Sequence, residues 1–206
     1  MKSIIIISAT ILLLVTPVLA VIGPIPVDES NDLVDGKIYG WVTITKIDDY
    51  CVEIKADANE TVLIPGENFG IQAFGFNYNG STSCLDVTAP VGWVESTGTL
   101  DGFGIFIEKV DTTGSYRQDP LFITVCNTCG ELQEADVVVA NAKGYTFAMH
   151  IADFSGNECI DDTDDCSSAF FATKKTTQIE LSSFTAKPAN GSVTLNWATE
   201  TEIDNV

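Results

Sequence analysis

The chain has 206 residues, of which 29 are Asp or Glu and 10 are Lys or Arg, so its formal net charge is −19 at pH 7. This acidic surface repels nucleic acid and anionic lipid, which excludes both as expected partners. The length suits one sandwich domain of ordinary size plus a fragment, and two complete domains would be crowded.

Residues 1–20 have the pattern of a secretory signal peptide. Lys2 is the single basic residue, an apolar run extends from Ile4 to Leu14, and a small residue, Ala20, suits a cleavage site. The alternative is a retained membrane anchor, but this run is shorter than the roughly 20 apolar residues of a spanning helix. We therefore expect an exported chain with no membrane span in its mature form.

The next segment, residues 21–35, contains two prolines and several acidic residues with no clean period, which predicts an extended leader. We expect the β-sandwich domain to cover residues 36–175. Its first segments, GKIYGWVTITKI and YCVEIKA, alternate apolar and polar residues, with Asp48 and Asp49 forming a hairpin turn between them.

Alternation of this kind continues through the body of the chain and predicts an all-β fold, an antiparallel β-sandwich of the jelly-roll or Ig-like kind. The only helical signal is the short segment 130–136. The expected inward-facing sets are Phe103, Ile105 and Ile107; Leu121, Ile123 and Val125; and Phe147, Met149 and Ile151.

Five motifs follow one another in a fixed order: FGFNYNG, the pair Gly92-Trp93, LDGFGIF, DPLFITV and FAMHIADF. This order resembles the ectodomain of exported PEP-CTERM-type surface proteins, over residues 70–155. The resemblance implies a β-sandwich body and an envelope location, and it implies no known chemistry.

Six cysteines behind an export signal favour disulfides, because exported proteins meet an oxidising environment. Fifteen pairings are possible. Proximity in the sequence favours Cys126 with Cys129 and Cys159 with Cys166, which leaves Cys51 with Cys84. Two alternatives use Cys126-x-x-Cys129 as half of a zinc site or as a redox-active pair, without the expected second ligand pair or βαβ context.

The densest acidic cluster lies in the loop between Cys159 and Cys166, and it is the one candidate cofactor site, for calcium. Hard oxygen ligands from a short loop suit this ion, but the EF-hand spacing of Gly and Glu is absent. The alternative is a solvated acidic loop. The candidate ligands are Asp161, Asp162, Asp164 and Asp165.

Trp41 and Trp93 are predicted to be core aromatics, with an exposed platform for sugar as the alternative. The single histidine, His150, is out of phase with its apolar neighbours, and no nucleophile-elbow or metalloprotease motif accompanies it. No catalytic residue is assigned, and we expect no enzyme. Possible glycosylation sequons begin at Asn59, Asn79 and Asn190.

Residues 176–206 change in composition, with the strand-like segments IELSSFTA and SVTLNWAT on either side of Pro188–Gly191. This segment resembles the beginning of a fibronectin-type-III-like domain, of which it is an N-terminal fragment with two strands. Such a hairpin is marginal alone, so we expect it to be the least stable part of the chain.

Taken together, these features predict a secreted or cell-surface structural or adhesion module without catalytic activity. A calcium-dependent carbohydrate-binding module is the first alternative, and a secreted hydrolase or its accessory domain is the second. Surface polysaccharide or other envelope proteins are the expected partners. The two binding hypotheses differ in whether aromatic rings and the acidic loop meet on one exposed face.

Overall fold

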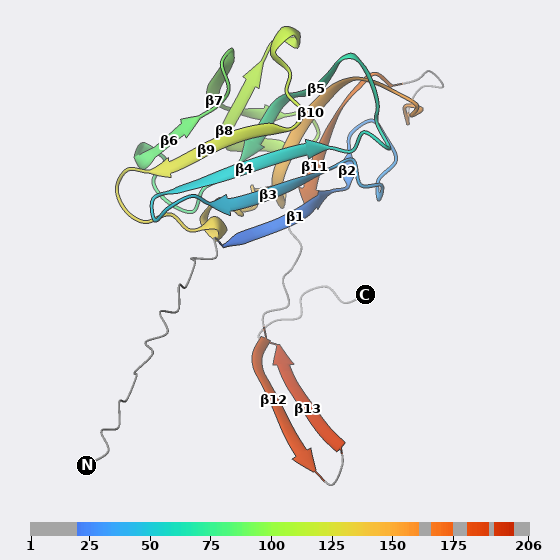
Figure 1. Cartoon of the computed structure of the whole chain (residues 1–206). Coiled ribbons are helices and arrows are strands. Elements are labelled where there is room, and N and C mark those ends of the chain that lie inside the picture. Colours follow the sequence, from blue (N-terminus) through green and yellow to red (C-terminus); the bar gives the residue numbers. More distant parts are fainter. Residues whose placement is uncertain (1–19, 161–165, 175–180, 190–191, 200–206) are drawn as a thin grey trace, which may run out of the picture.

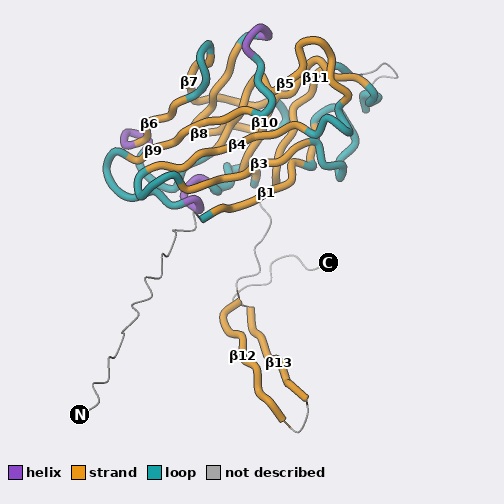
Figure 2. The backbone as a smooth tube through the Cα atoms, in the orientation of Figure 1, coloured by secondary structure: helices purple, strands orange, loops and turns teal. Residues whose placement is uncertain are grey.

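The computed structural model describes residues 20–160, 166–174, 181–189 and 192–199. Its main body consists of two antiparallel β-sheets packed face to face (Figure 1). This confirms the prediction of an all-β antiparallel sandwich. The strands are connected by loops and by three short 3₁₀ turns (Figure 2), namely η1 (Thr82–Cys84), η2 (Gly114–Tyr116) and η3 (Glu134–Val137).

The first sheet has five strands and the second has six. The five-stranded sheet contains, in spatial order, β1 (Val21–Val27), β3 (Gly40–Lys46), β4 (Cys51–Ala58), β9 (Leu121–Asn127) and β6 (Leu85–Thr88). The six-stranded sheet contains β2 (Glu29–Ser30), β11 (Ser168–Lys174), β10 (Tyr145–Ser155), β5 (Ile64–Phe76), β8 (Gly104–Thr112) and β7 (Trp93–Leu100).

The expected leader, residues 21–35, is part of the sandwich, so the prediction that the body begins at Gly36 is wrong. β1 pairs with β3 along the edge of the five-stranded sheet, and Val27 and Leu33 are buried in the core. Prolines are tolerated on an edge strand because its outer N–H groups need no partner. Pro24 lies at an irregularity between Ile22 and Ile25, which interrupts the alternation and concealed the strand in the sequence.

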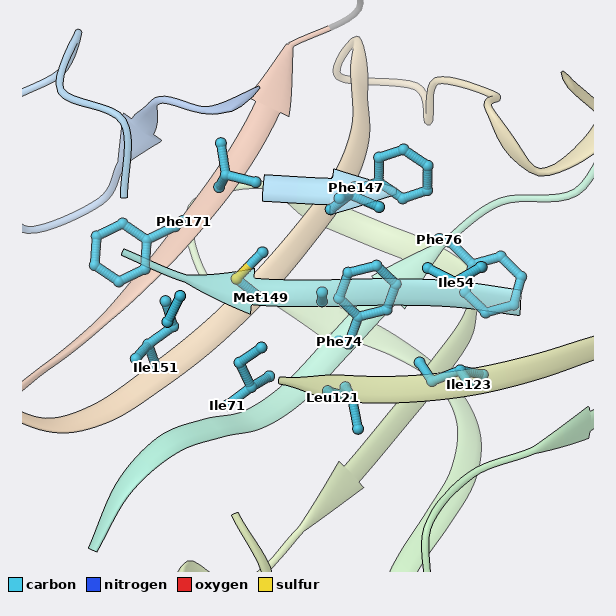
Figure 3. Packing of buried hydrophobic residues seen from close by; sticks show 14 of the residues in the cluster. Ile54, Ile71, Phe74, Phe76, Leu121, Ile123, Phe147, Met149, Ile151 and Phe171 are labelled. Carbon is cyan, nitrogen blue, oxygen red and sulfur yellow. The ribbon is translucent and has the colours of Figure 1, made fainter. Parts of the chain in front are cut away.

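The core lies between the sheets and is built from alternate residues of the facing strands (Figure 3). Two of the three predicted inward-facing sets are confirmed, since all their members are fully buried. These are Leu121, Ile123 and Val125 on β9, and Phe147, Met149 and Ile151 on β10.

The third set, Phe103 with Ile105 and Ile107 of β8, is wrong, because Phe103 is buried in a second cluster outside the core between the sheets. Ile105 and Ile107 are 64% and 40% exposed, whereas Phe106 is fully buried. The register between β7 and β8 shifts between Ser96 and Gly98. A shift of one residue exchanges the two faces of a strand, and no alternation pattern predicts where it occurs.

A second apolar cluster lies on the outer face of the six-stranded sheet. The end of the β7–β8 hairpin, residues 98–106, is called here the hairpin tip; its Leu100, Phe103 and Phe106 pack with small residues of the sheet. Asn141 Nδ2 and Lys143 Nζ hold the tip by donating to the carbonyl oxygens of Phe103 (2.9 Å) and Gly102 (3.0 Å). The small residues in this cluster are Ala73, Ala148 and Ala172.

The predicted turn at Asp48 and the predicted helical segment 130–136 can also be compared with the structure. Asp48 shapes the turn between β3 and β4 as expected, because its Oδ1 accepts hydrogen bonds from the backbone N–H groups of Tyr50 (2.8 Å) and Cys51 (2.9 Å). The helical signal at 130–136 corresponds to the single 3₁₀ turn η3.

The C-terminal pair β12 (Leu181–Ala189) and β13 (Ser192–Thr199) forms a two-stranded antiparallel sheet of its own, as predicted. Its register places Phe184 opposite Trp197. Among the described residues, no helix is both long and apolar enough to cross a membrane.

Candidate functional site

Six cysteines form three disulfides, and no described cysteine is free. Cys159 pairs with Cys166 as predicted, but Cys51 pairs with Cys126 and Cys84 pairs with Cys129. The predicted pairs Cys126–Cys129 and Cys51–Cys84 are therefore wrong. Cys51 lies directly opposite Cys126 in the β4–β9 register, so closeness across the sheet outweighs closeness in the sequence.

These disulfides have two consequences for function. A sulfur in a disulfide cannot ligate zinc as a thiolate, and Cys126 and Cys129 belong to different bridges, so Cys126-x-x-Cys129 is neither a zinc half-site nor a redox pair here. Three structural disulfides also indicate an extracellular or otherwise non-cytosolic location.

The calcium candidates Asp161, Asp162, Asp164 and Asp165 lie outside the described residues. Both ends of their loop are fixed: Ile160 N–H donates to the Asp32 carbonyl (2.7 Å) and Cys166 N–H donates to the Asn157 carbonyl (2.8 Å). Within the described ranges, no group of three or more His, Cys, Asp or Glu residues could hold a metal ion. Calcium binding by the loop stays a prediction.

A pocket of about 310 Å³ lies beside this loop. Two of its polar groups are already used within the fold, because Tyr39 Oη donates to the Val34 carbonyl (2.5 Å) and Asn157 Nδ2 donates to the Val62 carbonyl (2.7 Å). The pocket thus has few polar groups left to orient a ligand. Its lining residues are Leu33, Val34, Lys37, Tyr39, Gly156, Asn157 and Glu158.

The outer surface of the five-stranded sheet is a stronger candidate for a binding site than this pocket. No described strand or helix lies over it in Figure 1. We call it the open face and define it by the outward positions of β3, β4 and β9, which are Trp41, Thr43, Thr45, Glu53, Lys55, Asp57, Phe122 and Thr124.

Trp41 lies on this open face, so its assignment to the core is wrong. Its neighbours Gly40 and Val42 are buried, and the period of two along β3 turns Trp41 outward, where it is half-buried. Trp93 is also half-buried, but it packs against the edge of the core and donates from Nε1 to the Tyr116 carbonyl (2.9 Å). Trp93 therefore lies at the periphery of the core, and its predicted assignment to the core is only partly correct.

The open face places two aromatic residues on either side of an ion pair. In the strand register, Trp41 is opposite Asp57, and Lys55 is opposite both Thr43 and Phe122. Lys55 Nζ lies 2.6 Å from Asp57 Oδ2, and the Phe122 side chain is 46% exposed.

The aromatic pair and the acidic loop belong to different parts of the sandwich. Trp41 and Phe122 project from the five-stranded sheet. The Cys159–Cys166 loop connects β10 to β11 in the six-stranded sheet, and its described ends bond to Asp32 and Asn157. This arrangement favours an aromatic platform that functions without the loop.

His150 lies on the outer face of the six-stranded sheet, turned away from the core as its phase predicted. Its ring stacks on Phe170 with centroids 4.3 Å apart, and its Nε2 is 2.6 Å from Ser168 Oγ. Burial, together with the nearby charge of Arg117, lowers the pKa of His150. Within the described chain, no carboxylate hydrogen-bonds to this imidazole, so the pair lacks the orienting acid of a catalytic triad.

Glu108 is a buried carboxyl that the sequence did not single out. It is 7% exposed, and burial, followed by the charge and hydrogen bond of Glu95, raises the pKa of Glu108 to about 7. The expected alternation on β8 had placed it outward. The local signal for the other phase is Val110, two residues along β8, which is apolar and packs in the core between the sheets.

Asp119 is a second carboxyl with a raised pKa, and it lies two residues before the start of β9. Burial raises the pKa of Asp119 to about 6, although its Oδ1 accepts a hydrogen bond from the Ala58 N–H (2.8 Å). This bond ties the residue preceding Pro120 to the end of β4, which is a structural role.

The three glycosylation candidates differ in access. Asn59 is 8% exposed, and its Nδ2 donates to the Ile38 carbonyl (2.8 Å), so the folded domain does not present it. Asn79 is exposed, and Asn190 lies outside the described residues.

No protein-family model matches this chain, and neither a curated protein nor a solved structure was found that matches it.

Proposed function

We propose that this chain is an exported structural or adhesion module of the cell surface or extracellular space, with no catalytic role. The supporting observation is the open face, a sheet surface with outward Trp41 and Phe122 on a scaffold held by disulfides. Large exposed surfaces that combine aromatic and polar side chains commonly bind partners. The acidic charge and the sequence of residues 1–20 agree with export.

Export and oxidation are tested together by expressing the full chain in a bacterial host and measuring the intact mass of the protein outside the cytosol. We expect a chain that begins at Val21 and lacks six hydrogens, one pair for each disulfide. Free thiols, or retention of residues 1–20, would contradict this part of the proposal.

Adhesion is tested by incubating the exported protein with isolated cell-envelope material. We expect sedimentation with that material, and we expect Thr43→Arg combined with Thr124→Arg to abolish it by placing two charged side chains on the open face. Val94→Arg is the control, because Val94 is 63% exposed on the opposite sheet. Equal loss in both variants, or no sedimentation of the parent protein, would count against the proposal.

A calcium-dependent carbohydrate-binding module is the second candidate, and the acidic loop is the feature that favours it. Calcium should then raise the melting temperature through binding to the folded state. Asp164→Asn with Asp165→Asn should remove that gain. An equal gain with magnesium would indicate only screening of charge.

The hydrolase alternative has the weakest support. Glu108 and Asp119 have raised pKa values, about 7 and about 6, that suit proton transfer near neutral pH. Glu108 is buried, Asp119 accepts a hydrogen bond from the Ala58 N–H, and neither residue lines the 310 Å³ pocket.

A further inference from the structure

The two aromatic residues of the open face have a defined spacing. Trp41 is on β3 and Phe122 is on β9, with β4 between them. In the register, the Trp41–Asp57 row is two residues along from the Lys55–Phe122 row. Strands about 4.8 Å apart and residues about 3.4 Å apart then place the two backbone positions about 12 Å from each other. This separation suits two contacts along one extended ligand.

The groups between the aromatic residues can exchange hydrogen bonds with such a ligand. An ammonium has three donors and a carboxylate has about four acceptor sites, so the Lys55–Asp57 bond uses only part of the capacity of each group. Thr43 lies beside Lys55 in the same row and adds a hydroxyl group that can donate and accept. A ligand rich in hydroxyl groups would satisfy these sites.

Charge and polarity narrow the class of ligand. Asp57 and Glu53 outnumber Lys55 on the open face, and the whole chain has a net charge of −19, which disfavours anionic ligands. Two rings separated by an ion pair offer no continuous apolar stripe for a lipid chain or an amphipathic helix. A neutral ligand with flat apolar faces and hydroxyl edges fits both requirements.

We propose that the open face binds an extended neutral polysaccharide, whose sugar rings stack on Trp41 and Phe122 and whose hydroxyl groups bond to Lys55 and Asp57. This inference rests on the proposed adhesion function and names its ligand class. The C–H face of a pyranose packs against an aromatic ring, and its equatorial hydroxyl groups point sideways toward polar side chains. Binding does not require the acidic loop or calcium.

The disulfide between β4 and β9 supports this site. Cys51 and Cys126 face each other on the two strands that also contain Lys55 and Phe122, and each lies four residues from the site residue on its strand. The cross-link fixes the register of this strand pair, so the platform loses little freedom when a ligand binds.

The test is a sedimentation assay of the oxidised full chain with microcrystalline cellulose and with chitin, both extended β-1,4-linked polymers, in the presence of a metal chelator. Dextran, which is α-linked and flexible, is the comparison polymer. We expect binding to cellulose or chitin with little binding to dextran, and at least a tenfold weaker affinity for Trp41→Ala and for Phe122→Ala.

Tyr116→Ala is the matched control, because the Tyr116 side chain is 49% exposed, close to the 46% of Phe122. Its affinity should equal that of the parent protein. Should Trp41→Ala fold poorly, Trp41→Phe keeps a smaller ring and should lower the affinity less than Phe122→Ala does.

Failure to bind cellulose and chitin, or an equal loss in Tyr116→Ala, would overturn the inference. The proposed function has a separate outcome. Sedimentation with envelope material that the Thr43 and Thr124 variant abolishes, without polysaccharide binding, would retain adhesion and reject this ligand. Binding to cellulose or chitin that occurs without the chelator and is lost in its presence would likewise reject a calcium-independent site.

Discussion

The outer faces of the two sheets differ in whether other parts of the chain pack over them. On the six-stranded sheet, the hairpin tip covers part of the outer face, over Ala73, Ala148 and Ala172, and buries Phe103 and Phe106. On the five-stranded sheet, the outer face is open, and cross-links stabilise it instead: Cys51–Cys126 joins β4 to β9, and Cys84–Cys129 joins η1 to the loop after β9.

The size of the outward side chains explains this difference. Ala73, Ala148 and Ala172 leave room for aromatic rings to approach the six-stranded sheet. At Gly75, a Cβ atom would lie 2.8 Å from Phe106 Cγ, so even alanine would obstruct the hairpin tip. The outward threonine and charged side chains of the five-stranded sheet leave no comparable space for aromatic rings to pack against the sheet. That face is therefore free for a ligand.

The largest expected loss of stability comes from removing a buried ring of the hairpin tip. Phe106→Ala deletes a fully buried ring and leaves a cavity over the alanine residues, which should cost about 3 to 5 kcal/mol of unfolding free energy. Phe122→Ala removes the same ring from the open face and should cost less than about 1 kcal/mol. Denaturant unfolding of both variants measures the difference. Equal losses would mean that Phe122 packs as a core residue.

The disulfides should contribute the next largest effect. Replacing Cys51 and Cys126 by alanine releases a link across 75 residues, whereas replacing Cys159 and Cys166 releases a link across 7. The loop-entropy relation gives losses of about 4.5 and about 2.4 kcal/mol, respectively. Thermal unfolding of the two double variants checks the order. A larger loss for the Cys159–Cys166 pair would contradict the order that loop length predicts.

Alternation predicted the sheets where strands are regular. Leu121, Ile123 and Val125 lie in an undisturbed strand, so the period of two was sufficient to place them in the core. It failed at β8, where the register shift turned Phe106 and Glu108 against expectation, and at β1, where the irregularity at Pro24 concealed an edge strand. Such irregularities depend on the neighbouring strand, which the local sequence does not contain.

The candidate site was less predictable than the fold. The sequence identified Trp41 as a possible sugar platform, but the core was the favoured location because most aromatic residues are buried. The pairing of Lys55 with Asp57, and their position between Trp41 and Phe122, depends on strands that are distant in the chain. The disulfide partners were hidden for the same reason.

Glu108 gives a smaller effect that depends on pH. The pKa of Glu108 is raised in the folded state to about 7 by burial and by Glu95, so the folded state favours the protonated carboxyl. Its stabilising contribution is complete below the unfolded pKa and is lost as the pH rises through about 7. Glu108→Gln should therefore raise the melting temperature at pH 8 by a few degrees and leave it nearly unchanged at pH 4.

Glu95→Gln is the matched variant, because it removes the nearby charge and retains the Glu108 carboxyl. It should reproduce part of the gain at pH 8. A melting temperature for Glu108→Gln that is equal to or lower than that of the parent protein at pH 8 would indicate that Glu108 ionises normally or has an unrecognised partner.

The smallest expected effect concerns the ion pair of the open face. Lys55 and Asp57 are each 37% exposed, and a partly exposed pair of this kind contributes about 0 to 1 kcal/mol, because water and salt screen it. A double-mutant cycle with Lys55→Met and Asp57→Asn should give a coupling free energy near the lower end of that range, and added salt should reduce it further. The same two substitutions should each weaken polysaccharide binding severalfold, since they remove donors and acceptors from between the aromatic residues. An ion pair that contributes to ligand binding but hardly to folding stability is what we expect on the open face and not on the covered one. A coupling above about 2 kcal/mol with unchanged binding would show that Lys55 and Asp57 serve the sheet, and the open face would then resemble its covered counterpart.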